Sequence, residues 1–110
     1  MKLPNGERAD LGMKLEEYAL NPQHRDGRHK ARVFASALGI TYANRHVLRR
    51  AILAVAATSD QAEARGDNGH GELYQLRFRM ETTKGAAFVR TAWIVRRGEG
   101  FPRLVTCYID

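Results

Sequence analysis

The hydrophobic period of this chain changes near Asp60, and this change restricts the fold more than any other feature. Before Asp60 the apolar residues recur every three or four positions, as they do in amphipathic helices. After Asp60 apolar and polar residues alternate, as they do in β-strands with one buried face. Helices followed by a run of strands predict an α+β fold, with three N-terminal helices packed on one face of a four-stranded antiparallel sheet.

The three helices are predicted from their apolar stripes and their end signals. Asp10 is a suitable N-cap for the first helix, and Pro22 ends it because the residue before a proline avoids the helical conformation. Gly39 follows the second helix, at the position where a glycine commonly stops one. The predicted helices cover residues 11–20, 28–38 and 43–57.

Four strands are predicted after Gln61, separated by the turn-like clusters DNGHG, TTKG and GEGFP. The third strand, AAFVRTAWIVRR, is apolar on both faces, so we expect it in the middle of the sheet. A chain of 110 residues is long enough for one modest core, so residues 1–110 are expected to form a single domain. The side chains expected in that core are Leu15, Phe34, Leu38, Leu48, Ile52, Tyr74, Leu76, Phe78, Ile94 and Val105.

Several classes of protein are not supported by the sequence. No apolar run is long enough to cross a membrane, and the first residues lack the apolar core of a signal peptide, so a cytoplasmic protein is expected. Cys107 is the one cysteine and lies in an apolar alternation, which predicts a buried, inert thiol. Asp67, His70 and Glu72 lie close together, but GDNGHGE is typical of a hairpin turn rather than of a metal site. No glycine-rich phosphate loop occurs, and no cofactor is expected.

The chain is strongly basic. Its 18 lysine and arginine residues against 12 aspartate and glutamate residues give a net charge of +6. Such an excess favours approach to polyanions, which include RNA, DNA and acidic proteins. Arginine supplies most of the charge, and its planar guanidinium suits bidentate contacts with phosphate. A biased genomic base composition is the alternative reason for the abundance of arginine.

Much of this charge lies in the stretch LNPQHRDGRHKARVFASALGI, where His24, Arg25, Arg28, His29 and Lys30 surround a predicted helix start. Cations there oppose the helix dipole, so their clustering favours a bound anion, and a solvated helix start is the alternative. Histidine suits proton transfer near neutral pH, and lysine suits the stabilisation of charge on a phosphorane. Together these residue types match the needs of RNA cleavage without a metal.

A second polar set lies on the predicted strands. Arg90 alternates with apolar residues, so it points towards an apolar face where an arginine needs a partner or a ligand. On the last strand Thr106 and Tyr108 share one face, and Arg103 stands at its beginning. Threonine and tyrosine are also good strand formers, so a purely structural role is the alternative for these two residues.

The stretches LNPQHRDGRHKARVFASALGI and VRTAWIVRRGEGFPRLVTCYI resemble the two signature blocks of a bacterial family of uncharacterised short domains, which also occur as C-terminal domains of polymorphic toxins. The resemblance runs from KLPNGERA onward, and the layout is similar to the barnase–EndoU–colicin–RelE class of metal-independent ribonucleases. In that class polar residues of the helical segment and of the sheet face each other across a shallow cleft. The resemblance implies that the corresponding residues here are His24, His29, Lys30, Arg90, Thr91, Arg103, Thr106 and Tyr108.

Two functions follow from these patterns, and the sequence leaves both open. The first is a small ribonuclease toxin that acts on tRNA or mRNA and is held in check by an acidic antitoxin protein. The second is a non-catalytic module that binds nucleic acid or a partner protein with the same basic surface. In either case we expect His24 or His29, together with Lys30, to lie within side-chain reach of Arg90 or Arg103 at the junction of helices and sheet.

Overall fold

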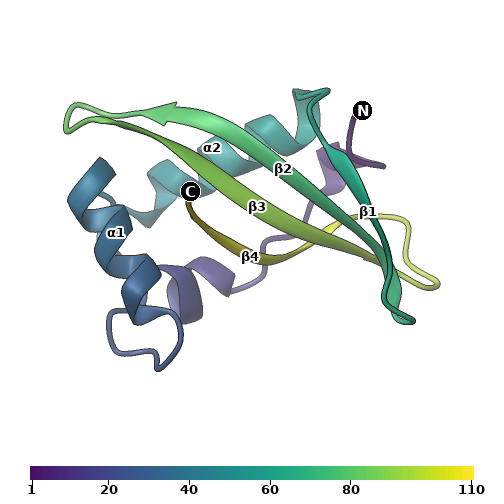
Figure 1. Cartoon of the computed structure of the whole chain (residues 1–110), viewed down its shortest axis with the longest axis horizontal. Helices are drawn as coiled ribbons and strands as arrows, with labels where there is room; N and C mark the ends of the chain where they lie inside the picture. The colour runs from purple at the N-terminus through teal and green to yellow at the C-terminus, as the bar shows by residue number, and fades with distance from the viewer.

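Two long helices precede a four-stranded antiparallel sheet in the computed structural model, which describes residues 1–110 (Figure 1). Two short helical turns, η1 (Gly6–Arg8) and η2 (Leu15–Ala19), come first along the chain. The α+β class is therefore confirmed. The long elements are α1 (Arg28–Leu38), α2 (Arg45–Thr58), β1 (Glu63–Asp67), β2 (Gly71–Glu81), β3 (Ala86–Arg96) and β4 (Arg103–Ile109).

The sheet is a meander in which each strand pairs with the next along the chain. β3 lies between β2 and β4, as its apolar character on both faces predicted. The register places Leu76 of β2 and Cys107 of β4 on either side of Thr91, and all three side chains point into the core. Residues of the opposite parity point to the other face of the sheet, because side chains alternate along a strand.

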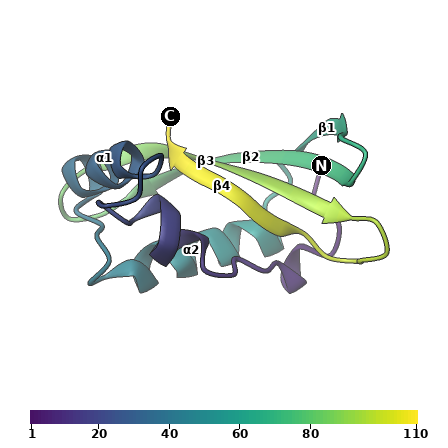
Figure 2. The same ribbon diagram turned by 90° about the horizontal axis from the view of Figure 1, so that it is seen from below.

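The helices cover the sheet unequally. α2 lies along one face, whereas α1 stands at one end of the sheet beside the end of β4 (Figure 2). We call the face opposite α2 the open face. Neither α1 nor α2 has the length and apolar character needed to span a membrane.

The expectation of three helices packed on one face is met only in part, because residues 11–20 do not form a regular α-helix. They contain a single π-helical turn, Leu15–Ala19. The Asp10 carboxylate accepts from the N–H of Gly12 at 2.8 Å, so it caps a tight turn instead of a helix. The Asp10 backbone is bound to the edge of β4, where its carbonyl accepts from the N–H of Leu104 at 2.9 Å. With Asp10 held at the strand edge, the chain turns at Gly12 and Met13, and helical backbone begins only at Lys14.

The core contains most of the side chains expected there, and one of the exceptions comes from a β-bulge in β4. The pairing of β3 with β4 shifts between Ala92 and Trp93, where Thr106 lies opposite the first and Leu104 opposite the second. Val105 is the extra residue of this bulge, and its exposed fraction is 41%, so the prediction that it is buried is wrong. Phe78 and Ile94 are only half-buried, and Ile94 belongs to the open face.

Gly6 allows η1 to pack directly on the end of α2. A Cβ at this position would lie 1.8 Å from the carbonyl oxygen of Ala56, which is backbone and cannot move aside cheaply. We expect Gly6→Ala to lower the free energy of unfolding by about 1–3 kcal/mol, as overpacking usually does. Urea denaturation measures this, with Gly100→Ala as the control because its Cβ would meet nothing closer than 3.8 Å. Equal stability of the two variants would contradict the packing.

Cys107 is fully buried on the core face of β4, and this burial raises the pKa of its thiol to about 12. At pH 8 the group is therefore the neutral thiol, which is not a nucleophile. We expect iodoacetamide to leave Cys107 unmodified in the native protein and to alkylate it rapidly in denaturant. Intact-mass measurement over time checks both rates. Rapid alkylation of the folded protein would contradict the inert role predicted from the sequence.

Candidate functional site

Lys30 connects the helical segment to the sheet. It lies in the first turn of α1, and its side chain extends towards η2 and the end of β4. Its ammonium group donates a hydrogen bond to the hydroxyl of Tyr18. Its Nζ atom also lies 4.8 Å from the centre of the Tyr18 ring and 5.9 Å from the centre of the Tyr108 ring. The positive charge is thus held between two tyrosine rings, an arrangement that cation–π attraction favours.

His24 supports this arrangement from the loop before α1. Its Nδ1 accepts hydrogen bonds from the backbone N–H groups of Asp26 and Gly27, each at 3.0 Å. The ring meets the Tyr18 ring edge-to-face at a centroid distance of 4.9 Å. Because Nδ1 accepts these two bonds, the neutral imidazole carries its proton on Nε2. His24 therefore satisfies free N–H groups at the beginning of α1 and holds Tyr18 in place.

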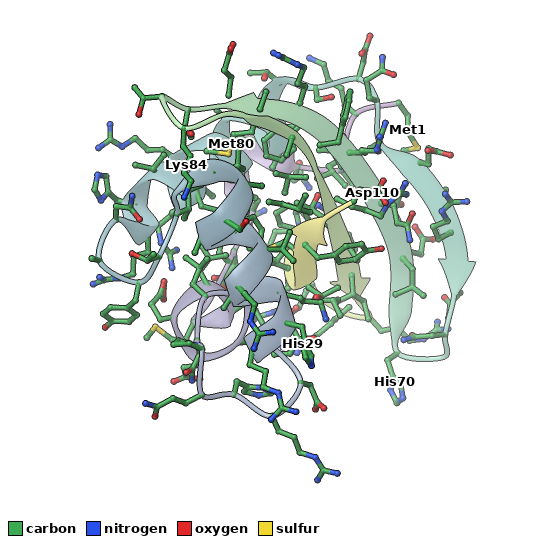
Figure 3. The ribbon with its side chains drawn as sticks, turned by 60° about the vertical axis from the view of Figure 1, so that its left-hand side comes forward. Met1, His29, His70, Met80, Lys84 and Asp110 are labelled. Carbon is green, nitrogen blue, oxygen red and sulfur yellow. The ribbon has the colours of Figure 1, made fainter.

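His29 is exposed next to Lys30 and forms no hydrogen bond or ion pair. Figure 3 shows it at the N-terminal end of α1, whereas His70 projects from the turn between β1 and β2. Both nitrogens of the His29 ring are therefore free for proton transfer. Of the two histidines predicted from the sequence, His29 has a free ring and His24 is used by the fold.

The sheet contributes Tyr108 and Arg90 to this site. They are direct cross-strand neighbours in the register of β3 with β4, so both side chains lie on the open face. Thr106 shares this face, and its hydroxyl is buried without a hydrogen-bond partner. Thr91 does not share it. Its Oγ1 donates to the carbonyl of Leu76 at 2.7 Å inside the core.

Arg90 is held by an acidic partner that the sequence analysis missed. Its Nη2 and Nε donate to one carboxylate oxygen of Asp110, at 2.8 and 3.2 Å, and its Nη1 donates to Gln75 at 2.9 Å. Arg77 donates to the same Asp110 oxygen at 2.8 Å. The hydrogen bond with Asp110 raises the pKa of Arg90, and the same bond lowers the pKa of Asp110. Arg90 was predicted to need a partner or a ligand, and Asp110 is its partner.

Arg103 lies apart from these residues. It pairs with Ile94, four positions along β3 from the partner of Tyr108, which corresponds to about 13 Å. Both carboxylate oxygens of Glu99 accept from it at 2.9 Å, and Asp10 accepts at 3.2 Å. The hydrogen bond with Glu99 raises the pKa of Arg103. Arg103 is therefore a structural ion-pair residue that fastens the N-terminal segment to β4.

The largest groove, of about 810 Å³, lies around Arg103 on the open face. Its arginines are Arg65, Arg96, Arg97 and Arg103, and all except Arg96 form ion pairs with carboxylates. Lys14 also lines the groove without an ion pair, so three of its five lysine and arginine side chains are paired with carboxylates. The lining extends to Gln75, which accepts a hydrogen bond from Arg90.

The sequence from residue 2 to residue 110 matches the profile of a family described as Domain of unknown function (DUF6883). The chain belongs to this family. Searches of curated proteins and of solved structures found no match. The expected membership of an uncharacterised domain family is confirmed, and the residues around Tyr108 all fall within the matched range.

Five side chains of this DUF6883 domain form one continuous group, which we call the Tyr108 cluster: Tyr18, His24, Lys30, Arg90 and Tyr108. His29 precedes Lys30 in α1 and Thr106 lies two residues before Tyr108 in β4, whereas Arg103 and Thr91 do not belong to the cluster. Tyr18 was not predicted as a site residue, because it lies in the first predicted helix, outside both polar sets. Asp110 has the same parity as Thr106 and Tyr108, and this signal in the sequence could have placed it on the open face.

Proposed function

We propose that this DUF6883 domain cleaves RNA without a metal ion, at the Tyr108 cluster. The observation that supports this proposal is the convergence of Lys30 from α1 with Tyr108 from β4, which are distant in sequence. A cation held between hydroxyl-bearing rings provides charge and proton donors at one point. Phosphodiester cleavage requires this combination, because negative charge develops on the phosphate oxygens while protons move.

Each residue has one role in the proposed reaction. His29 takes the proton of the ribose 2′-hydroxyl, and the 2′-oxygen attacks phosphorus. Lys30 stabilises the charge on the phosphorane, and Tyr108 positions the scissile phosphate. The bond from phosphorus to the 5′-oxygen then breaks, and the Tyr18 hydroxyl protonates the departing oxygen. The products are a 2′,3′-cyclic phosphate and a 5′-hydroxyl.

Two details of geometry support these assignments. The Tyr18 hydroxyl accepts from the Lys30 ammonium, so its own proton is free to be donated. Thr106 has a covered hydroxyl, which leaves Tyr108 as the more accessible group on β4 for contact with a phosphate. Arg90 contributes through its neighbour Tyr108, because its own charge is engaged by Asp110.

Incubation of the purified protein with tRNA in EDTA tests the proposal. We expect fragments that end in a 2′,3′-cyclic phosphate, identified by mass spectrometry and by their resistance to 3′-end ligation until the ring is opened and the phosphate is removed. If an mRNA is cleaved as well, the protein recognises the RNA backbone and not the fold of tRNA. Intact RNA after prolonged incubation, with binding still detectable, would refute the enzyme.

We further propose that the domain acts as a cytoplasmic toxin restrained by an acidic antitoxin protein. The support is its net charge of +6, which an acidic inhibitor would complement. Induced expression in bacteria should arrest growth, and Lys30→Ala should relieve the arrest. Growth unaffected by the wild-type protein would contradict the toxin.

A non-catalytic binding module is the second candidate. It is favoured by the fact that His24 and Arg90 are both engaged by partners of the protein itself, so neither is free for chemistry. A binding module and an enzyme differ in their response to alanine substitution. In a module each substitution lowers RNA affinity by a modest step. It also lowers the slope of log affinity against log salt concentration by about one, because one phosphate contact is lost. In an enzyme the same substitution stops cleavage while affinity changes little.

A further inference from the structure

The net charge of the protein is concentrated in one segment. Residues 21–50 contain seven lysine and arginine side chains and a single acidic residue, Asp26, a balance of +6. The remainder of the chain contains eleven of each sign and is neutral. The whole excess of positive charge therefore belongs to α1, the beginning of α2 and the loops that precede these two helices.

The ion pairs increase this imbalance. Six of the seven arginines between residues 65 and 103 form ion pairs with carboxylates. In residues 21–50 only Arg49 does so, with Glu16 at 2.6 Å. The arginines of this segment that have no carboxylate partner are Arg25, Arg28, Arg32, Arg45 and Arg50. The sheet is thus electrically balanced, and the helical end of the molecule is not.

A groove of about 330 Å³ lies within this unbalanced region, and we call it the α1 groove. Arg28, Arg32 and the exposed ring of Tyr42 line it, and no carboxylate does. Arg45 is fixed beside the groove, with its guanidinium carbon 4.3 Å from the centre of the Tyr42 ring and its Nη1 bound to the Tyr42 carbonyl at 3.0 Å. The remaining lining is mainly apolar: Leu20, Pro22, Ala31, Ala35, Thr41 and Ala43.

We propose that the α1 groove binds a single-stranded nucleic acid. Its phosphates would contact Arg28 and Arg32, and one base would pack against Tyr42. Guanidinium groups match phosphate in geometry and charge, and an aromatic ring accepts any base by stacking. An acidic peptide would use the arginines but has no planar group for the ring, so the exposed tyrosine favours a nucleic acid.

This groove is separate from the Tyr108 cluster. Lys30 lies two positions from both Arg28 and Arg32, which is about 200° around the helix, so its side chain extends to the other side of α1. Binding in the α1 groove therefore does not depend on cleavage, and it holds for an enzyme and for a binding module alike. For an enzyme it would be a second contact that retains the substrate.

Binding of a fluorescent single-stranded DNA of about 12 nucleotides, followed by anisotropy over a range of salt concentrations, tests the proposal. DNA lacks the 2′-hydroxyl, so it cannot be cleaved by the proposed reaction, and a failure here is distinguishable from a failure of the enzyme. We expect Arg28→Glu with Arg32→Glu to weaken binding at least tenfold and to lower the salt slope by about 1–1.5. Acidic residues near a helix start are compatible with its dipole, and circular dichroism verifies that α1 persists.

The matched control is Arg79→Glu with Arg97→Glu, which changes the net charge equally on exposed, paired arginines of the sheet hairpins. It should weaken binding less than threefold. Tyr42→Ala should weaken binding by about 5- to 150-fold without changing the salt slope, because stacking involves no counterion. Equal losses of affinity from both charge reversals would overturn the proposal. A polyglutamate of equal charge provides a second test: the proposal is also overturned if it binds as tightly as the DNA and its affinity is unchanged by Tyr42→Ala.

Discussion

Replacing Lys30 with alanine should reduce the rate of RNA cleavage by about 10²–10³-fold, the usual effect of removing one donor that stabilises an oxyanion. The reason is that Lys30 provides the one ammonium held between Tyr18 and Tyr108, and no arginine of the cluster has a free charge to replace it. Single-turnover cleavage of labelled RNA in EDTA measures the effect. Lys30→Arg keeps a charge there and should retain part of the activity.

Two controls separate a catalytic role of Lys30 from a structural one. Lys2→Ala removes an exposed lysine that forms no ion pair, and it should leave the rate unchanged. His29→Ala should reduce the rate by about 10²–10⁴-fold without altering stability, because the His29 ring has no partner in the fold. If Lys30→Ala lowers the melting temperature and the rate together, while His29→Ala changes neither, the Tyr108 cluster is structural.

Trp93→Ala should lower the free energy of unfolding by about 3–5 kcal/mol, among the largest losses from a single truncation in a core of this size. Trp93 is fully buried on β3, between the paired residues Tyr74 of β2 and Leu104 of β4. Its indole N–H donates to the hydroxyl of Thr91 at 2.8 Å, so the substitution removes both packing and a buried hydrogen bond. Denaturant unfolding followed by circular dichroism measures the loss.

Because such a loss is a large fraction of the stability of a small domain, a milder substitution and a matched control accompany the alanine variant. Trp93→Phe keeps a ring in the same space and should lose only about 1–3 kcal/mol. Phe88→Ala is the matched control on the same strand, since Phe88 points to the open face with an exposed fraction of 41%, and it should cost less than about 1 kcal/mol. Similar losses at both positions would contradict the assignment of the core face.

The change of hydrophobic period near Asp60 determined the order of the elements without any tertiary information. The helix from Arg28 to Leu38 and its stop at Gly39, with φ of +68°, depend on signals within a few residues. The same is true of the buried face of β2 and of the central place of β3. These features were predictable because local periodicity and turn chemistry are properties of neighbouring residues.

The tertiary structure alone decided which residues meet. A bulge in β4 placed Val105 outside the core, and no local pattern marks where one strand gains an extra residue against its neighbour. Attachment of Asp10 to the edge of β4 left only a short helical turn of the first predicted helix, since hydrogen bonds to a distant strand hold its beginning.

The candidate site shows the same division. Residue types and clustering indicated His24, His29, Lys30, Arg90 and Tyr108, because chemistry is visible in a sequence. Their partners were not visible. The bond of Lys30 to Tyr18 depends on how α1 and η2 dock on the end of the sheet, whereas the engagement of Arg90 by Asp110 and the separation of Arg103 depend on the register of β3 with β4. Docking is set by contacts between residues far apart in the chain, and a one-dimensional pattern does not contain those distances.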